Sequence, residues 1–326
     1  MSEWRYNQDR NIQLRNGDVL ITKDGTIGKV AYVQGMTCPT TLNSGVFVIR
    51  PANDELQSSF LQLIFKSRFF LEFLDRITAG STIVHLYQKD IVEFDFPIPE
   101  IAEQCRIARN IEMIDGHLAK IKHLITKYEA VKKATVKLLL KPKDSWQQIR
   151  LGDIGEVSMC KRILKCQTSA TGDVPFYKIG TFGKQPDAYI SRSLFGDFKK
   201  RFSYPKVGDV LLSAAGTIGR TVVFTGEDAY FQDSNIVWIA NDEKIVSNRF
   251  LNVIYSQIDW QTENGGTVSR LYNANIRDAV ISIPGLNEQK RIVETLDTID
   301  NTIKGLKAQL QKAQAIKQGM MAYFFG

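Results

Sequence analysis

The side chains most suggestive of chemistry in this chain are two aspartates and a lysine in its second half. Pro186-Asp187 followed by Asp197-Phe198-Lys199 has the spacing of a PD…DxK signature, in which paired carboxylates hold Mg²⁺ for phosphodiester cleavage. The pattern is short and degenerate, and Asp197 follows a glycine in a predicted turn. A metal-dependent nuclease using Asp187, Asp197 and Lys199 is therefore kept only as an alternative function.

Other catalytic or metal-binding patterns are absent from the sequence. No pair of cysteines has CxxC spacing, and the histidines have no spacing that would complete a zinc site. There is also no glycine-rich cofactor loop after a predicted strand, and no Asn-Pro-Pro-aromatic tetrapeptide of the kind used for base amino-methylation. We predict a non-catalytic chain that binds no metal and no cofactor of its own.

A glycine-bounded turn, Gly-Thr-Ile-Gly, occurs at residues 25–28 and again at 216–219. It lacks the GxxxxGK[ST] pattern of a phosphate-binding loop, so the glycines are expected to serve backbone turns. Basic residues beside the turns could still reach phosphates. A glycine-led polar loop that ends in Ser269 and Arg270, with His85 at the matching position of the first half, is a candidate groove-facing element.

Two basic clusters, Lys161–Lys165 and Lys199–Arg201, lie in the second half of the chain, the latter flanked by Phe198 and Phe202. Such clusters are often solvated surfaces, but in a DNA reader they supply the phosphate contacts that position the protein. The candidate DNA-binding residues are Lys23, Thr26, Lys29, His85, Lys161, Arg162, Lys165, Lys178, Lys184, Lys199, Lys200, Arg201, Ser213, Thr217, Arg220, Ser269 and Arg270.

The whole chain repeats itself at a long interval. Residues 17–28 (GDVLITKDGTIG) return as 208–219 (GDVLLSAAGTIG) with 8 of 12 positions identical, and residues 86–107 return as 271–292 with 9 of 22 identical. The offset falls from 191 to 185 along the chain, a period too long for a solenoid. It indicates two copies of a domain with its connector.

Each copy ends in a predicted long helix with a heptad pattern, one from near Glu103 to Leu140 and the other from near Glu288 to Phe325. Apolar residues recur in alternating steps of four and three, which is the seam of a coiled coil. We expect the two helices to pack antiparallel as a spacer. The seam positions are Ile107, Ile111, Ile114, Leu118, Ile121, Ile125 and Tyr128 in the first helix, and Ile292, Leu296, Ile299, Ile303, Leu306, Leu310 and Ala313 in the second.

The globular parts alternate short β-runs with turn residues. In the second copy we predict a turn followed by a strand within 207–213, strands at 221–224 and 234–239, and then a short helix at 248–257. The fold class is therefore α+β, with two β-rich modules and two long helices. The predicted divisions are a first module at 1–99, a helix and linker at 100–145, a second module at 146–286, and a second helix at 287–326.

Composition places few limits on function. The 326 residues carry a net charge of +7 with a pI near 9.1, which permits nucleic-acid binding without an overwhelming basic patch. Residues 1–15 are polar, unlike a signal peptide, and the most apolar stretch, 60–74, is interrupted by Lys66 and Arg68. We expect a cytoplasmic protein with no membrane partner.

Taken together, these motifs resemble the specificity (S) subunits of type I restriction–modification systems. The resemblance rests on the Trp146…Leu151-Gly152-Asp153-Ile154 opening, on the GDVL…GTIG element in each copy, and on the IP…EQ.RI entry into each long helix. It covers essentially the whole chain. It implies two target recognition domains, each reading half of a split double-stranded DNA site, separated by the two helices.

The resemblance also implies the partners. Two modification (methyltransferase) subunits would dock on the helices, bind S-adenosylmethionine and methylate adenine, and restriction subunits using ATP and Mg²⁺ could join. The opening seen at Trp146 has no counterpart in the first copy, so we expect an N-terminally truncated first domain and association with a complementary chain or a second copy. A further alternative is an interaction protein that occupies modification subunits through its helices without reading a full site.

Overall fold

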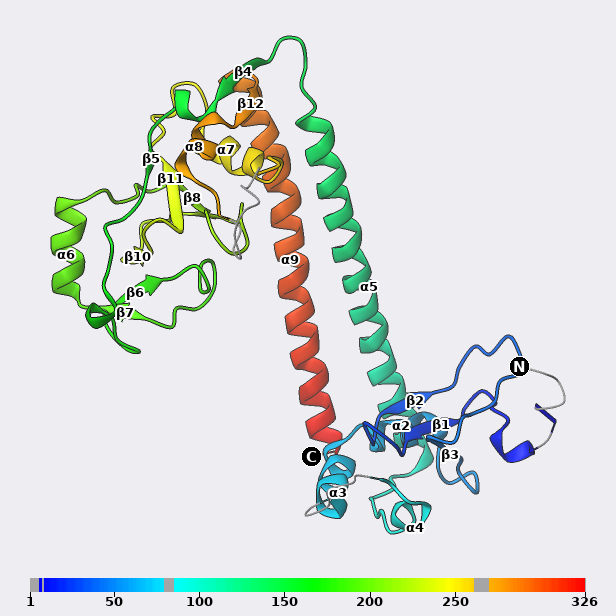
Figure 1. Cartoon of the computed structure of the whole chain (residues 1–326). Helices are drawn as coiled ribbons and strands as arrows, with labels where there is room; N and C mark the ends of the chain where they lie inside the picture. Colours follow the sequence, from blue (N-terminus) through cyan, green and yellow to red (C-terminus); the bar gives the residue numbers. More distant parts are fainter. Residues whose placement is uncertain (1–5, 8, 79–84, 261–269, 326) are drawn as a thin grey trace. The chain divides into compact units, whose positions relative to one another are not determined.

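The computed structural model describes residues 6–7, 9–78, 85–260 and 270–325 (Figure 1). The chain divides into two compact units, residues 1–127 with 304–326, and residues 128–303. This division cuts each long helix, so each unit contains one end of both helices. The structure is α+β, as predicted. No helix in the described part of the chain is both long enough and apolar enough to cross a membrane.

The first unit is built on a three-stranded antiparallel sheet in the order β2-β1-β3. Its strands are β1 (Val19–Thr22), β2 (Val30–Tyr32) and β3 (Val46–Ile49). Buried residues of β1 pack with phenylalanines of the helices in one core. The helices before the spacer are η1 (Arg10–Ile12, a 3-10 helix), α2 (Ser58–Ile64), α3 (Arg68–Thr78) and α4 (Gln88–Ile91).

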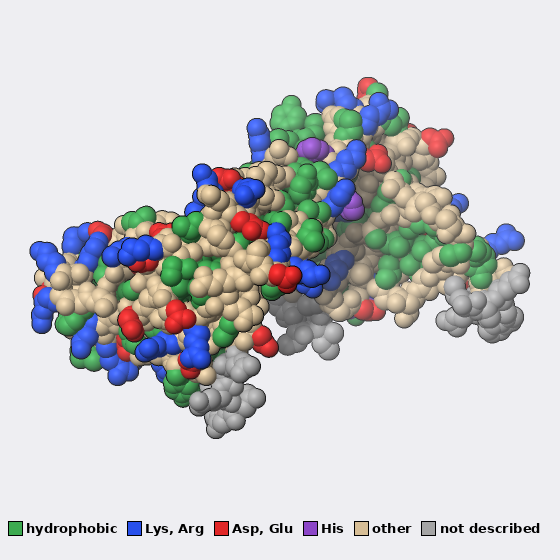
Figure 2. All heavy atoms as spheres, turned by 90° about the horizontal axis from the view of Figure 1, so that it is seen from above, with side chains coloured by type: hydrophobic (Ala, Val, Ile, Leu, Met, Phe, Trp, Pro, Cys, Tyr) green, Lys and Arg blue, Asp and Glu red, His purple; other side chains and the backbone are tan. Residues whose placement is uncertain are grey.

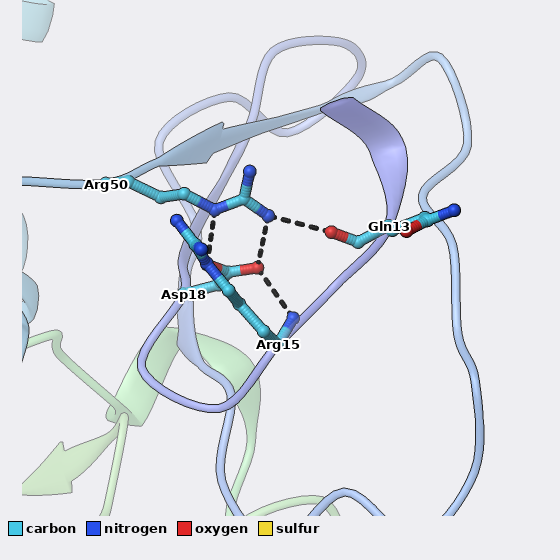
Figure 3. Close-up of polar contacts among 4 residues, drawn as sticks. All are labelled: Gln13, Arg15, Asp18 and Arg50. Carbon is cyan, nitrogen blue, oxygen red and sulfur yellow. Dashed lines mark hydrogen bonds and ion pairs between the residues drawn. The ribbon is translucent and has the colours of Figure 1, made fainter. Parts of the chain in front are cut away.

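A buried carboxylate holds the start of β1 (Figure 3). Asp18 is 1% exposed and accepts hydrogen bonds from Arg50 Nε at 2.6 Å and Nη2 at 2.8 Å. The Arg15 backbone N–H donates to the same carboxylate at 2.9 Å, and Arg50 Nη2 also donates to the Gln13 carbonyl at 2.7 Å. Burial alone would raise the pKa of Asp18, but these bonds and the arginine charges outweigh it and lower that pKa.

The second unit contains the same sheet with additional strands. The four-stranded sheet runs β5-β11-β8-β9, a second sheet runs β10-β6-β7, and β12 pairs with β4. Two cores lie within the unit, one of which includes residues of the long helices. The elements are β4 (Gln147–Arg150), η2 (Leu151–Asp153), β5 (Val157–Ser158), η3 (Lys165–Gln167), β6 (Val174–Tyr177), β7 (Tyr189–Ile190), α6 (Arg192–Arg201), β8 (Val210–Ser213), β9 (Thr221–Val223), β10 (Tyr230–Phe231), β11 (Ile236–Ile239), α7 (Asn248–Tyr255), α8 (Asn273–Asp278) and β12 (Val280–Ile283).

The sequence repeat is a structural repeat. Strands β8, β9 and β11 correspond to β1, β2 and β3, and their registers agree: Ile21 lies opposite Phe47 as Leu212 lies opposite Val237. The predicted strands and the short helix of the second copy are confirmed as β8, β9, β11 and α7. The register is therefore kept although the offset changes from 191 for β1 to 190 for β3, because a one-residue slip would turn the buried face of each strand outward.

The two long helices are α5 (Ile101–Leu139) and α9 (Leu286–Phe325), which begin two residues before the predicted starts. In the first unit they run antiparallel, with Arg106 against the Phe324 ring and Lys317 Nζ 2.5 Å from Asp115 Oδ1. In the second unit the other ends of α5 and α9 also run antiparallel: Lys132 Nζ lies 2.6 Å from Asp300 Oδ1, and Lys143 Nζ donates to Glu288.

The seam residues differ in burial along the helices. Leu118, Ile121, Ile125 and Ala313 form a small core in the first unit, with Leu306 and Leu310 packed on it. Toward the helix ends the stripe joins the cores of the modules, because Ile107 and Ile111 pack with the first module's phenylalanines. Ile292, Leu296 and Ile303 are buried in the second unit, whereas Ile114, Tyr128 and Ile299 are partly exposed.

Candidate nucleic-acid interface

The Gly-Thr-Ile-Gly turn is closed by the residue that ends the preceding strand. Ser213 Oγ donates to the Thr217 carbonyl at 2.5 Å and accepts from the Arg220 N–H at 2.9 Å. In the first unit Thr22 makes the same two bonds, at 2.6 and 3.0 Å. Ser213 is 1% exposed, so its expected role as a DNA contact is corrected: its hydroxyl shapes the turn instead.

The last glycine of each turn is required for packing as well as for conformation. Gly28 and Gly219 have φ values of +75° and +82°, which favour glycine. A Cβ on Gly219 would lie 2.7 Å from Trp260 Cδ1, and one on Gly28 would lie 2.3 Å from Leu74 Cδ1. The glycines therefore serve the backbone and the packing of the turn.

In the second unit three segments meet around this turn. Arg220 Nη1 donates to the Phe182 carbonyl at 3.0 Å, which ties the turn to the loop that carries Lys178 and Lys184. Arg270 pairs through its backbone with Ala215, and its Nη2 donates to the Ser234 carbonyl at 2.9 Å. The guanidinium groups of Arg220 and Arg270 thus hold neighbouring loops together.

Ser234 is an unusual position in this surface. Its φ is +61°, a left-handed conformation that non-glycine residues adopt only when their surroundings impose it. The bond from Arg270 fixes its carbonyl, and neighbouring Asp233 lies 3.6 Å from Arg162 Nε. Neither Ser234 nor Asp233 was selected from the sequence, because their conformation and contacts depend on residues far along the chain.

The first unit has the same framework with different side chains. The Leu86 N–H donates to the Lys23 carbonyl at 3.0 Å, as Leu271 donates to Ala214 at 2.8 Å. His85, at the position of Arg270, contacts the carboxylate of Asp24 through Nδ1, and the counterpart of Asp24 in the second unit is Ala215. Lys23 Nζ lies 5.0 Å from the Phe47 ring centre, and Thr26 and Lys29 are exposed.

Helix α6 carries a basic cluster against aromatic rings. Lys199 Nζ lies 5.0 Å from the ring centre of Phe195 and 4.9 Å from that of Tyr204, so cation–π contacts hold it close to the surface. Asp228 accepts a hydrogen bond from Arg192 at 2.8 Å and lies 3.6 Å from Lys199. Figure 2 shows Lys and Arg side chains grouped at the end of the second unit where α6 lies.

Two further cations of this cluster share one ring. Lys161 Nζ and Arg201 Cζ lie 5.3 and 5.2 Å from the centre of the Phe202 ring. Arg201 also pairs with Asp197 at 2.9 Å, whereas the structure gives Lys200 no ionic partner among the described residues. The pairing reduces the net charge that this cluster presents.

The candidate residues therefore fall into two sets. Lys178, Arg162, Lys199, Arg201 and His85 each have an acidic partner, and Arg220 and Arg270 bind backbone carbonyls. Ser269 lies outside the described residues. Other candidates are exposed, and within the described residues the structure gives their side chains no ion pair or hydrogen bond: Thr26, Lys29, Lys161, Lys165, Lys184, Lys200 and Thr217.

The residues of the nuclease alternative are occupied elsewhere. Asp187 pairs with Lys178 at 2.9 Å, Asp197 pairs with Arg201, and Lys199 lies against aromatic rings. Asp197 belongs to α6 and not to the predicted turn. Across the described residues no group of three or more His, Cys, Asp or Glu side chains could hold a metal ion. The geometry gives no support to metal-dependent cleavage.

Comparison with known proteins gives a consistent result. The family of the type I restriction modification DNA specificity domain matches residues 1–130 and 143–315. A Haemophilus influenzae protein that carries the name of a type I restriction enzyme specificity subunit is 42% identical over 310 residues, covering 91% of this chain and 79% of that protein.

Two solved structures resemble the fold. The type I restriction–modification system S subunit from M. genitalium matches with a TM-score of 0.62 and 14% identity, covering 97% of this chain and 84% of that one. A chain from a structure of type I restriction–modification complex assembly and conformational transition matches with a TM-score of 0.58 and 18% identity, covering 98% and 84%. At these identities the likeness supports the fold alone.

Proposed function

The chain belongs to the type I restriction–modification DNA specificity family, and on this basis we propose that it directs adenine methylation by partner subunits to a bipartite DNA site. The chain binds double-stranded DNA and contributes the sequence specificity. It is non-catalytic: S-adenosylmethionine belongs to the modification subunits, and ATP and Mg²⁺ belong to the restriction subunits that can join the complex. The occupied carboxylates of the second module support a role without catalysis.

The observation that carries the proposal is that both units contain the same hydrogen-bonded Gly-Thr-Ile-Gly turn, with different side chains beside it. The turn after β1 or β8 has the same hydrogen bonds in both units. Beside it, the first unit presents His85 with Asp24 and the second presents Arg270 with Ala215. Because direct readout depends on which donors and acceptors meet the base edges, two such surfaces would read two different half-sites.

Phosphate contacts are assigned to the cations that have no competing partner. Lys184 and Lys200 are exposed and have no acidic partner in the described structure, unlike Lys178 and Arg201. A paired cation must give up its carboxylate before it neutralises a phosphate, so it contributes less to binding. Lys184 and Lys200 are therefore the first candidates for non-specific contacts, which position the protein on the duplex.

The docking surface for modification subunits is assigned to exposed apolar residues of the helices. Val131 and Leu138 are 41% and 73% exposed on α5, and Ile316 and Tyr323 are 47% and 83% exposed at the equivalent positions of α9, with the same offset of 185. Each pair is separated by seven residues, two turns along one helix face. Two equivalent apolar surfaces, one in each unit, suit two copies of one partner.

Mapping methylated adenines in cells that contain this chain and its modification subunits tests the proposal. We expect a split site whose two parts differ in sequence. Methylation that is unchanged when the chain is deleted would contradict it.

Purified complexes then test the assigned contacts. The Lys184→Gln, Lys200→Gln double variant should lower the slope of log affinity against log salt by roughly 2, since each lost phosphate contact removes about 0.9. Lys244→Gln, which removes a cation already paired with Asp242, is the matched control and should leave the slope unchanged.

A further inference from the structure

Each long helix buries a glutamine in its first turn. Gln104 of α5 and Gln289 of α9 are both 0% exposed, although glutamine is usually a surface residue. They occupy equivalent positions, separated by the offset of 185 that relates the two helices. A polar side chain retained twice at a fully buried position requires a physical reason.

The hydrogen bonds of Gln289 supply that reason in the second unit. Its Nε2 donates to the carbonyl of Ile245 and to that of Pro284, both at 2.9 Å. Its Oε1 accepts from the Ser247 N–H at 2.9 Å. Both amide hydrogens and one acceptor position are therefore used by backbone groups from two separate segments.

Gln104 makes the same three bonds in the first unit. Its Nε2 donates to the carbonyls of Glu55 and Pro99, both at 2.8 Å, and its Oε1 accepts from the Gln57 N–H at 2.8 Å. Glu55 and Gln57 correspond to Ile245 and Ser247, and Pro99 corresponds to Pro284. We call this arrangement the glutamine clamp.

The clamp joins the spacer helix to the module that precedes it. Ser247 is the N-cap of α7, and Gln57 is the N-cap of α2. Helix α7 packs on β8 and β9, and Thr221 Oγ1 of β9 is hydrogen bonded to Asn252 Oδ1 of α7 at 2.7 Å. Strand β9 begins directly after the Gly-Thr-Ile-Gly turn. The clamp is thus two elements away from the candidate DNA surface.

We propose that Gln104 and Gln289 are positioning residues that fix the angle of each recognition module on its own spacer helix, and so determine which separation of the two half-sites is accepted. The proposal rests on the proposed function. Apolar side chains could fill the same space, but they would allow the helix start to rotate against the α2 or α7 N-terminus. Three directional bonds to backbone groups permit one orientation.

The experiment uses the complex of the full chain with its modification subunits. Binding and methylation are measured on duplexes that keep both half-sites and change the base pairs between them by one or two in either direction. Wild type should prefer one separation. Gln289→Met and Gln104→Met, which keep the volume and remove the bonds, should each reduce this preference at least about tenfold, with the half-site sequences unchanged. Gln148→Met, at an exposed position of β4, is the control and should retain the wild-type preference.

The outcomes separate a positioning role from a structural one. If folded Gln289→Met and Gln104→Met complexes keep the wild-type preference, the proposal is overturned. Equal loss at every separation, or loss of cooperative unfolding in both variants, would show that the clamp serves stability alone and would also overturn it. Failure of the wild-type complex to recognise a split site would count against the proposed function, independently of the variants.

Discussion

The two glycines of one turn should respond very differently to the same substitution. Gly216 and Gly219 both have positive φ values, +64° and +82°. A Cβ on Gly216 would have its nearest neighbour at 3.6 Å, on Ile179, which is ordinary contact. A Cβ on Gly219 would lie 2.7 and 2.8 Å from two atoms of the Trp260 indole, so the ring or the turn would have to move.

The expected costs follow from these geometries. A left-handed conformation costs a non-glycine residue about 1 to 2 kcal/mol, and alanine recovers about 0.4 to 1 kcal/mol by restricting the unfolded chain. Gly216→Ala should therefore lower the free energy of unfolding by about 1 kcal/mol. Overpacking adds about 1 to 3 kcal/mol, so Gly219→Ala should cost about 2 to 4 kcal/mol.

Urea unfolding followed by tryptophan fluorescence measures the difference. Trp146, Trp238 and Trp260 all belong to the second unit, so the signal reports mainly on it. Far-UV circular dichroism, measured in parallel, distinguishes unfolding of the unit from a local change of fluorescence at Trp260. Equal midpoint shifts for the two variants would refute the reasoning. The reasoning would also be refuted if, in the Trp260→Ala variant, Gly219→Ala still lowered the free energy of unfolding more than Gly216→Ala does.

Three further predictions concern charged groups. Arg50→Met should lower the free energy of unfolding by about 2 to 3 kcal/mol at pH 7, because it leaves buried Asp18 without its partner. This difference from wild type should shrink as the pH falls through the lowered pKa of Asp18, and urea unfolding at pH 7 and pH 3 measures it. Asp209 is the counterpart of Asp18 in the second unit, and burial raises its pKa, so its negative charge opposes folding at a pH above its ordinary pKa of 3.8. Asp209→Asn should therefore leave the free energy of unfolding unchanged or increase it at pH 7, whereas Asp18→Asn should lower it in the same assay. Lys132→Met and Lys317→Met remove equivalent, partly exposed ion pairs, and each should lower the melting temperature by an amount corresponding to at most about 1 kcal/mol, less at high salt.

Local patterns in the sequence were sufficient to predict the helices and strands named below and the repeat that relates the two halves of the chain. The heptad steps predict α5 and α9 to within two residues at their starts, because a periodic apolar stripe over about six turns has few other solutions. The strands β8 and β9 follow from short apolar runs between glycines, and β11 follows from a short apolar run after Asp233. The GTIG glycines were correctly assigned to turns, since the pattern lacks the residues of a phosphate-binding loop.

Only the tertiary structure decided which polar residues are available to a ligand. Arg220 and Arg270 are indistinguishable from free cations in the sequence, but they bind carbonyls of residues 38 and 36 positions away. Ser213 is polar in sequence and buried in the fold, and Gly219 is more closely packed than Gly216 because Trp260 lies against it. The sequence by itself determined the two modules and their helices, because short-range periodicity reports backbone conformation and one buried face. The partners of Arg220, Arg270 and Gln289 were decided by long-range packing, because a hydrogen bond depends on where a distant backbone group comes to lie.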